Sequence, residues 1–412
     1  MVLKQKRWLI LIASCFVTLC IGSLYAWSVF ATPMAAHLSE ITGTNITSLA
    51  IIFTIANAVG PITMISGGFI NDRLGPKRIL LAGGLLFGLG MARSGFATSV
   101  PMLMVTYGLG VGLGVGMIYG TTVSNVVKFF PDKRGLAGGL ITACYGGSSI
   151  LIPPIATILV SAYHITTAFQ ILGIVMMLII CASAFVIIPC PADFNPVREC
   201  SEKSATPDNS SRPTDCTYKE MLQKPAFYYM ILTLTCGSFA GLMIISQASP
   251  IAQTMMGFSS AAAAAVVSLL AFFNMLGRLI SGSISDKIGA VATLKCTFVL
   301  SFLASILLYF CTESTTLFFF AGLAVIGFCF GSIMGIYPGF TAAQFGSKNN
   351  SVNYGIMFIG FAAAGLAGPM IMNQIFTITS RYQPAFLASA FLAFIGITLL
   401  FLLEKNLKKN SL

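Results

Sequence analysis

The stretch FFNMLGRLISGSISDKIG, from Phe272 to Gly289, combines an apolar segment with a single arginine and a polar end. Arg278 precedes Asp286, where the polar sequence begins, by about 12 Å of helix at about 1.5 Å per residue. Because the hydrocarbon core of a bilayer is about 30 Å thick, we expect Arg278 to lie near its middle. A guanidinium there costs on the order of 2.5–3.5 kcal/mol on insertion scales, and such residues generally face a wet cavity. The stretch therefore predicts a membrane helix whose arginine meets an anion.

The composition of the whole chain agrees with this prediction. Of 412 residues, 56% are hydrophobic and only 8% are charged, whereas soluble domains carry about 25% charged residues. The net charge of +11 would suit nucleic-acid binding. However, all but three of the 23 lysines and arginines fall in alternate connections and at both termini, as the positive-inside rule requires. The exceptions are Arg93, Arg278 and Arg381.

This pattern predicts an all-α integral membrane protein with both termini in the cytoplasm, in a plasma membrane such as a bacterial inner membrane. Hydropathy predicts twelve membrane helices, which fits two ends on one side. They are expected at 8–31, 48–70, 79–97, 101–127, 137–160, 166–188, 226–247, 260–284, 290–310, 314–340, 352–376 and 382–403. The first run is too long for a signal peptide and lacks an evident cleavage site, so we expect it to be retained.

An internal repeat divides the chain. GFINDRLGPKR, from Gly68 to Arg78, and GSISDKIG, from Gly282 to Gly289, both fit the pattern GxxxD(R/K)xG. A second echo pairs KFFPDKRGLAGG at 128–139 with AQFGSKNNSVNYG at 343–355. We therefore predict six-helix bundles at 1–188 and 226–412, joined by a polar cytoplasmic linker at 189–225. Parallel six-helix repeats are typical of transporters that bind substrate at the midplane between the two halves.

The GxxxD(R/K)xG loops resemble the signature of the major facilitator superfamily, and the resemblance covers essentially the whole chain. It implies that these loops make charge-assisted contacts with neighbouring helix ends and act as gates. The alternative is that their basic residues only set the topology. The predicted gating residues are Gly68, Asp72, Arg73, Gly75, Arg78, Asp286, Lys287 and Gly289, and Lys77 belongs to the same basic cluster.

Three shorter motifs narrow the resemblance. They are GSLYAWSVF at 22–30, FFNMLGRLISG at 272–282 and NYG at 353–355. Together they resemble the oxalate/formate antiporter family, to which the monocarboxylate transporters are similar. The resemblance implies transport of small organic anions.

The polar face of the eighth predicted helix carries the expected substrate site. Residues three or four apart share a helix face, so Asn274, Arg278, Ser281 and Ser285 form one stripe. The corresponding position of the second helix, Met64, is apolar, so the site is expected to be asymmetric. No aspartate or glutamate lies within a predicted membrane core. We therefore expect the substrate to neutralise Arg278, through the two parallel hydrogen bonds that an arginine donates to a carboxylate.

Two departures from the family pattern bear on the substrate and its coupling. In oxalate exchangers the resemblance implies a lysine where this chain has Phe361, and a single cation favours a monocarboxylate such as lactate, pyruvate or formate over oxalate. In proton-coupled relatives it implies an aspartate where this chain has Asn274, which cannot titrate. Exchange, facilitated diffusion and coupling through the substrate's own proton remain open. Export of cationic drugs is disfavoured because membrane carboxylates are lacking.

Aromatic residues on other predicted helices are expected to close around the substrate, because they offer an apolar body and, in tyrosine and tryptophan, one polar hydrogen. The alternative is ordinary packing or an interfacial belt. The candidates are Tyr25, Trp27, Tyr119, Tyr145, Tyr337 and Phe361.

Other chemistry finds little support in the sequence. The glycine-rich YGLGVGLGVGMIYG at 107–120 lies in a membrane helix and is expected to serve packing, not nucleotide binding. His37 and His164 are far apart in the sequence and predict no metal site, and the eleven cysteines show no ligand spacing. We expect no enzymatic activity, no cofactor, no nucleic-acid partner and a monomer in lipid.

Overall fold

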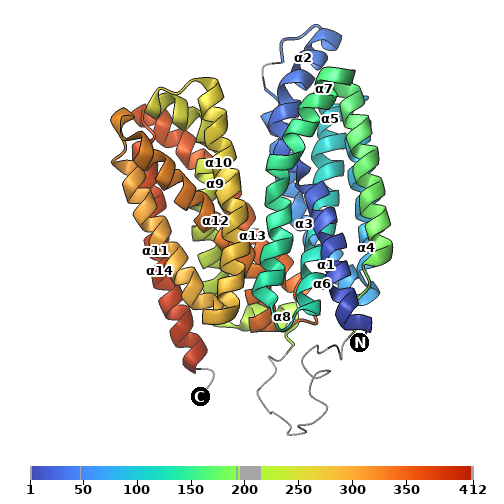
Figure 1. Ribbon diagram of the computed structural model, residues 1–412, viewed down its shortest axis with the longest axis vertical. Coiled ribbons are helices and arrows are strands. Elements are labelled where there is room, and N and C mark those ends of the chain that lie inside the picture. The colour runs from blue at the N-terminus through green and yellow to red at the C-terminus, as the bar shows by residue number, and fades with distance from the viewer. Residues whose placement is uncertain (1, 47, 192–193, 195–214, 410–412) are drawn as a thin grey trace. The chain divides into compact units, whose positions relative to one another are not determined.

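The computed structural model describes residues 2–46, 48–191, 194 and 215–409, and this part of the chain contains helices but no strands (Figure 1). The first half holds α1 (Val2–Ile21), η1 (Gly22–Ala26), α2 (Trp27–Thr42), α3 (Ala50–Leu74), α4 (Pro76–Ser94), α5 (Val100–Leu103), η2 (Met104–Val111), α6 (Gly112–Phe129) and α7 (Arg134–Val186). The second half holds α8 (Tyr218–Gln223), α9 (Pro225–Met256), α10 (Ser260–Ile288), α11 (Ala290–Tyr309), η4 (Glu313–Thr315), α12 (Thr316–Phe345), α13 (Asn350–Thr379) and α14 (Gln383–Lys409).

Each apolar segment expected from the sequence falls on helical structure. The segments expected at 137–160 and 166–188 form one element, α7, which is 53 residues long and interrupted at His164, where φ is 69° and ψ is 158°. Ten stretches of the described chain are long and apolar enough to cross a membrane, and α7 counts as one of them. Helix α4 is not among the ten; its 19 residues include Lys77, Arg78 and Arg93. The count of twelve crossings stays a prediction.

Two glycines of the repeated motif form sharp turns between helices. Gly75 follows α3 with φ 80°, and Gly289 follows α10 with φ 88°. Glycine adopts this left-handed backbone at little cost because it lacks a Cβ. Pro76 then begins α4, a position at which its missing N–H is not needed. The motif therefore ends one helix and starts the next in both halves of the sequence.

The chain forms two compact units. Unit 1 comprises Met1–Asp132, Cys144–Asp215 and Ala342–Ile356, and unit 2 comprises Lys133–Ala143, Cys216–Thr341 and Met357–Leu412. Helices α7 and α13 thus each contribute to both units. The bundles predicted at 1–188 and 226–412 stay a prediction. Within the predicted linker, 192–193 and 195–214 lie outside the described residues, while Thr217 caps the short helix α8.

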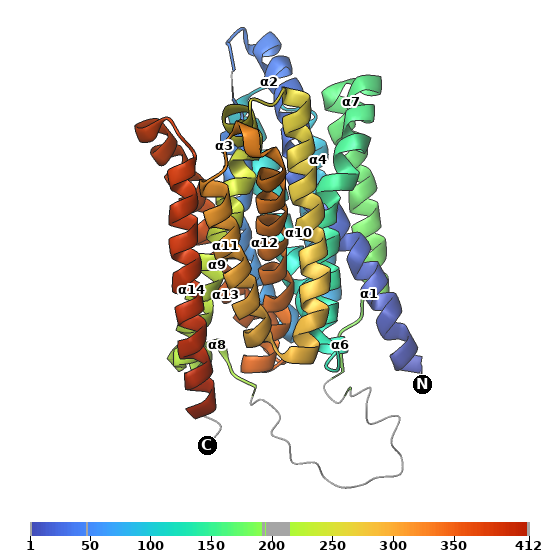
Figure 2. The same ribbon diagram turned by 60° about the vertical axis from the view of Figure 1, so that its left-hand side comes forward.

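Each unit has an apolar interior and an apolar exterior. In unit 1 the rings of Trp27 and Tyr107 lie 4.5 Å apart and those of Tyr107 and Phe169 5.9 Å apart. In unit 2, α9, α11 and α14 pack together (Figure 2), and buried side chains such as Leu270 and Phe386 form the core.

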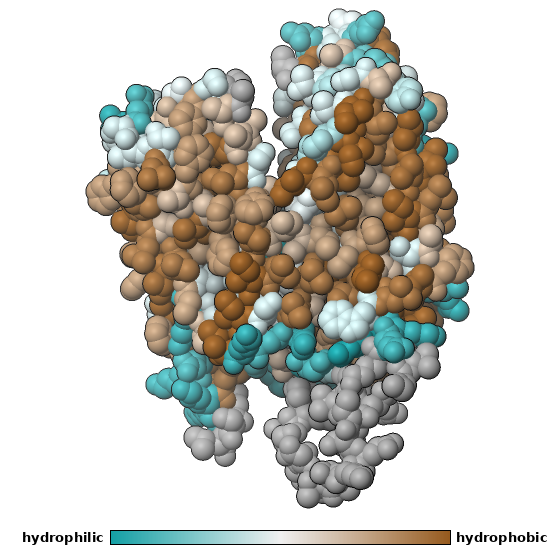
Figure 3. Space-filling view, viewed as in Figure 1, coloured by the Kyte–Doolittle hydropathy of each residue, from teal (hydrophilic) through white to brown (hydrophobic). Residues whose placement is uncertain are grey.

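The exterior of each unit exposes large apolar side chains over much of its length, including Ile62, Phe185, Leu303 and Ile378. On each unit the apolar surface gives way to hydrophilic residues toward the ends (Figure 3). Soluble proteins rarely expose such continuous apolar area, so these surfaces are suited to lipid.

Candidate functional site

Arg278 is the buried charge around which the candidate site forms. It lies on α10 in unit 2, and only 2% of its surface is exposed. Its Nε donates a hydrogen bond of 2.8 Å to Oδ1 of Asn274, and its Nη1 donates one of 2.9 Å to the carbonyl oxygen of Thr142 on α7. Among the described residues, no carboxylate forms an ion pair with Arg278. The guanidinium is therefore held by neutral acceptors and keeps its charge uncompensated.

Glycines on two neighbouring helices allow this close packing around Arg278. A Cβ added at Gly335 of α12 would lie 2.8 Å from the Cα of Arg278, and one added at Gly139 of α7 would press on the Arg278 carbonyl group. A Cβ at Gly331 would lie 2.8 Å from the carbonyl carbon of Asn274. Because real Cβ atoms do not come so near, α10 fits between α7 and α12 only with glycine at these positions.

The rest of the predicted polar stripe does not converge on the guanidinium. Ser281 forms a hydrogen bond of 2.7 Å with Ser332 of α12, and the Ser285 hydroxyl donates one of 2.7 Å to the Gly282 carbonyl. These serines bond to α12 and to their own helix. The stripe therefore reduces to Asn274 and Arg278 as a pair.

Three of the predicted aromatic residues lie together in unit 1. The rings of Tyr25 and Tyr145 are 5.3 Å apart, and those of Tyr119 and Tyr145 are 5.0 Å apart. Tyr25 lies in η1, Tyr119 in α6 and Tyr145 in α7, so three elements supply one tyrosine cluster. Trp27 packs on Tyr107 instead.

The remaining two aromatic candidates belong to unit 2. Tyr337 is fully buried, and its hydroxyl donates a hydrogen bond of 2.8 Å to the carbonyl oxygen of Met230. Phe361 stacks on Phe358 with ring centres 4.4 Å apart and lies 6.4 Å from Phe330. The predicted set is thus divided, and the hydroxyl of Tyr337 already has a backbone partner.

The first GxxxD loop binds the start of α13 within unit 1. Asp72 accepts a hydrogen bond of 2.8 Å from Lys128 Nζ and one of 3.4 Å from the N–H of Val352. Asn71 donates one of 2.6 Å to the Ser351 hydroxyl. A Cβ at Gly68 would lie 2.9 Å from the Val352 nitrogen, so glycine is needed at this crossing.

The second GxxxD loop binds the start of α7 within unit 2. The two carboxylate oxygens of Asp286 accept hydrogen bonds of 2.7 Å from the N–H of Gly135 and 2.8 Å from that of Leu136. A Cβ at Gly282 would lie 3.0 Å from the Cα of Gly139. Both motif aspartates therefore lie at helix N-termini, where unpaired N–H groups and the helix dipole favour a negative charge.

The basic residues of the two loops make weaker contacts. Arg73, Arg78 and Lys287 are exposed and form no ion pair with any residue the structure describes. Lys77 Nζ lies 4.3 Å from the centre of the Phe185 ring. Their predicted gating role stays a prediction.

The sequence identified the repeated stretches but not how they pair. In the structure, the first GxxxD loop meets 343–355 and the second meets 128–139, so each motif contacts the echo from the other half of the chain. The first loop also contacts Lys128, in the echo of its own half. Lys128 and Thr142 were missed as partners. Lys128 begins the echo KFFPDKRGLAGG, which was a usable signal, but the Thr142 carbonyl is a backbone group that no residue type announces.

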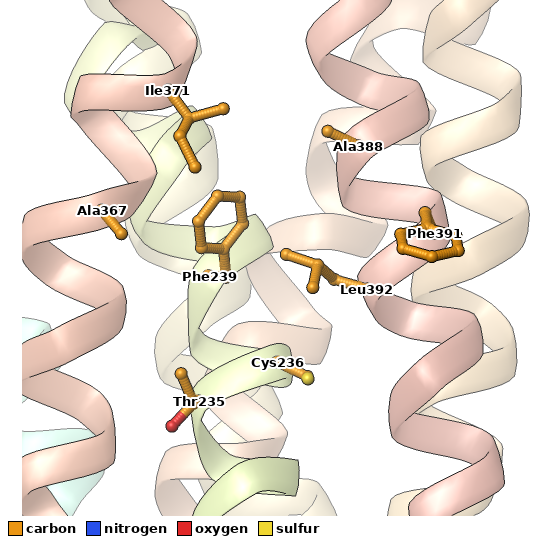
Figure 4. A pocket seen from close by; sticks show the side chains of 8 residues that line it. All are labelled: Thr235, Cys236, Phe239, Ala367, Ile371, Ala388, Phe391 and Leu392. Carbon is orange, nitrogen blue, oxygen red and sulfur yellow. The ribbon is translucent and has the colours of Figure 1, made fainter.

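Unit 2 also contains an apolar pocket of about 400 Å³. The lining side chains come from α9, α13 and α14 (Figure 4): Thr235, Cys236, Phe239, Ala367, Ile371, Ala388, Phe391 and Leu392. None of them is a candidate binding residue, and none carries a positive charge. The pocket therefore offers no partner for a carboxylate.

Comparison with known proteins assigns the family. The model of the Major Facilitator Superfamily matches residues 15–369. The uncharacterized transporter YhjX of Escherichia coli is 28% identical over 88% of this chain and 87% of its own length. The oxalate:formate antiporter of Oxalobacter formigenes is 28% identical over 96% of this chain and 91% of its own. Monocarboxylate transporter 12 of Xenopus laevis is 23% identical over 98% and 90%.

Solved structures agree on the fold. A crystal structure of the transporter FucP in the outward conformation matches with a TM-score of 0.69 at 14% identity, covering 95% of this chain and 98% of that one. A structure of the E. coli fucose:proton symporter FucP gives the same TM-score at 15% identity. The expected absence of enzymatic activity is confirmed by membership of a transporter family. The chain is an integral membrane protein that belongs to the Major Facilitator Superfamily.

Proposed function

We propose that this protein is a secondary transporter of small monocarboxylates of the lactate, pyruvate or formate type, and that Arg278 binds the carboxylate. The observation that carries the proposal is the guanidinium of Arg278, which is 2% exposed and has no ion-pair partner among the described residues. A buried charge without a partner is costly. A carboxylate substrate offsets that cost, so the substrate supplies the missing counter-ion.

The hydrogen bonds of Arg278 leave several of its N–H donors unused. Nε donates to Asn274 and Nη1 donates to Thr142, whereas Nη2 donates no hydrogen bond to the described residues. A guanidinium has more N–H groups than these two bonds use, and the remaining ones lie on Nη1 and Nη2. Two neighbouring N–H groups fit the two oxygens of one carboxylate. Asn274 thus orients the guanidinium and leaves its outer edge for substrate.

Exchange of oxalate and formate is the second candidate, because the oxalate:formate antiporter of Oxalobacter formigenes aligns with 96% of this chain. A dianion would gain from a second cation. The position where the resemblance implies a lysine holds Phe361, which stacks on Phe358. We therefore favour a monoanion over oxalate.

We propose that transport follows alternating access. The protein then has twelve membrane helices in the plasma membrane, with both termini in the cytoplasm. In the closed gate Asp72 holds the start of α13 and Asp286 holds the start of α7. The stretch of α7 that Asp286 holds, beginning at Gly135, also carries the Thr142 carbonyl that binds Arg278. A substrate that displaces Arg278 from Thr142 therefore loosens the segment that the gate holds.

Exchange is favoured over net flux. Without substrate, the uncompensated charge of Arg278 must pass through a dry, occluded state, which is costly. With a bound carboxylate the pair is neutral. The empty protein is therefore expected to switch slowly.

Uptake into liposomes tests this function. Purified protein should take up labelled lactate, pyruvate or formate faster than oxalate, and faster when the same anion is present inside. Arg278→Ala and Arg278→Lys should each lower uptake about thirtyfold or more, since truncating a buried charge partner costs about 2–5 kcal/mol. Lysine keeps the charge but cannot supply the two parallel hydrogen bonds. Arg381→Lys, at an exposed arginine, is the matched control and should leave uptake unchanged.

Three results would contradict the proposal at different points. Preferred uptake of oxalate would refute the argument from Phe361. Equal rates with and without internal anion would refute exchange. Uptake of a cationic drug with no uptake of any carboxylate would refute the organic-anion assignment itself.

A further inference from the structure

The chain contains only two histidines, and the structure places them in contact. His37 lies on α2 and His164 lies at the interruption of α7, and their ring centres are 5.1 Å apart with an angle of 70° between the rings. Both belong to unit 1. The labels of α2 and α7 lie near the top of Figure 1. Their separation in the sequence was the reason to expect no metal site, and the structure removes that reason.

The backbone at His164 is unusual. Its φ of 69° and ψ of 158° fall in a region that is nearly restricted to glycine. A residue other than glycine with this backbone conformation costs stability. Such residues occur where the surrounding structure imposes the conformation, often at a functional site. Here the strained joint presents the His164 ring to His37. Glycine would fit the joint better, so the backbone conformation does not by itself favour a histidine there.

We propose that His37 and His164 form a binding site for a divalent transition-metal ion of the Zn²⁺, Ni²⁺ or Cu²⁺ class. Neutral imidazole is the common protein ligand for these ions. Zn–N bonds of about 2.0–2.1 Å put each ring centre about 3.2 Å from the ion, so a tetrahedral angle separates the ring centres by about 5.2 Å. The observed separation is 5.1 Å.

The surroundings of the pair suit an ion that arrives from solution. His164 is exposed and His37 is half-buried. The His164 Nδ1 lies 3.3 Å from the Thr166 hydroxyl, and in the tautomer that donates this bond the lone pair of Nε2 is left for the metal. Glu40 lies one helical turn after His37 on α2.

The site offers two protein ligands. The described residues contain no group of three or more His, Cys, Asp or Glu side chains that could hold a metal ion. Water molecules therefore complete the coordination, and the ion remains exchangeable. A hard cation such as Mg²⁺, which prefers oxygen ligands, is not expected to bind.

Equilibrium titration of tag-free protein with Zn²⁺, Ni²⁺ and Mg²⁺ tests this inference without reference to any transported substrate. The cysteines are alkylated first, so that thiolates do not bind the ions. Wild-type protein should bind one Zn²⁺ or Ni²⁺ per chain and no Mg²⁺. His37→Ala and His164→Gly should each weaken binding about tenfold or more, since even losing an outer-shell partner of a metal ligand costs 10–100-fold.

His164→Gly removes the imidazole without straining the backbone. Glycine tolerates the backbone conformation at this position, so that variant is expected to fold. Glu40→Gln, which keeps both imidazoles, serves as the control and should retain Zn²⁺ binding within a few-fold. Equal Zn²⁺ affinity in wild type and both histidine variants, or Mg²⁺ binding as strong as Zn²⁺ binding, would overturn the proposal and leave the rings as an ordinary packing contact.

Discussion

At the scale of single residues, the proposed binding role rests on Arg278 and Asn274. The guanidinium is buried in unit 2 and donates to two neutral acceptors, and no described aspartate or glutamate forms an ion pair with it. Such an arrangement satisfies the geometry of the arginine without cancelling its charge. We therefore expect the proposed site to select an anion, and its single cation favours a monoanion.

Asn274→Asp should give Arg278 a negatively charged partner within the protein. A carboxylate at this position would pair with Arg278 and compete with the substrate, as close opposite charges attract strongly in the protein interior. We expect the KM for monocarboxylate uptake to rise about tenfold or more, without loss of protein stability. The concentration dependence of uptake into liposomes measures this.

Asn274→Leu is the matched control, because it removes the acceptor for Nε without adding a charge. It should change KM less than Asn274→Asp while lowering the thermal stability, since a buried donor then loses its partner. A KM of Asn274→Asp equal to that of wild type would show that the substrate does not bind at this guanidinium.

At the scale of elements, two helices are held at their first turns by motif carboxylates. Asp286 of α10 binds two N–H groups of α7, and Asp72 of α3 binds Lys128 and one N–H of α13. Glycines at Gly282 and Gly68 bring the backbones close enough for these bonds. The repeated sequence therefore encodes a repeated structural device, a carboxylate at a helix N-terminus.

Asp286→Asn and Asp72→Asn should each destabilise the protein, since hydrogen bonds to a charged group contribute about 1.5–3 kcal/mol. Each lost bond to a helix N-terminus should destabilise the protein more in Asp286→Asn than in Asp72→Asn. The two bonds of Asp286 to α7 are 2.7 and 2.8 Å long, whereas the bond of Asp72 to Val352 is 3.4 Å long. The two aspartates share no partner, so the double variant should show nearly additive loss. Thermal unfolding in detergent measures each effect.

The exposed Lys287 provides the control for these variants. Lys287→Gln removes a charge from the same loop and should change stability by no more than about 0.5 kcal/mol. If Asp286→Asn behaved like Lys287→Gln, the carboxylate at the start of α7 would have no structural role.

At the scale of the whole molecule, charge pattern and lipid-facing surface together predict the orientation in the membrane. Each unit exposes a broad apolar surface, and the lysines and arginines concentrate in alternate connections and at the termini. The positive-inside rule then puts both ends in the cytoplasm. It puts the connection between α11 and α12, at Glu313, outside.

Reporter fusions in a bacterial host check this orientation. A fluorescent protein fused after Leu412 should fold and fluoresce in the cytoplasm. Alkaline phosphatase inserted at Glu313 should be active, and the same enzyme inserted at Asp132, between α6 and α7, should be inactive as the control. Activity at Asp132 and inactivity at Glu313 would invert the predicted topology.

Several features could be read from the sequence because they depend on residue type and spacing alone. Composition specified a helical membrane protein, since few charged side chains can be placed in lipid. The repeated motif could also be read from the sequence, and in the structure its Gly75 and Gly289 adopt a backbone conformation that glycine forms easily. The sequence also shows that no aspartate or glutamate lies within a predicted membrane core, because this depends only on which residue types each segment contains.

The tertiary structure alone decided which groups meet across long separations. It brought each GxxxD loop to the echo from the other half and gave Arg278 a backbone carbonyl at Thr142. It also assigned Tyr337 and Phe361 to unit 2 and the tyrosine cluster to unit 1. It also brought His37 to His164. Backbone N–H and C=O groups are the same in nearly all residue types, so residue type does not show which of them will bind a side chain. Contacts between distant segments depend on how the helices cross, which the sequence does not show directly.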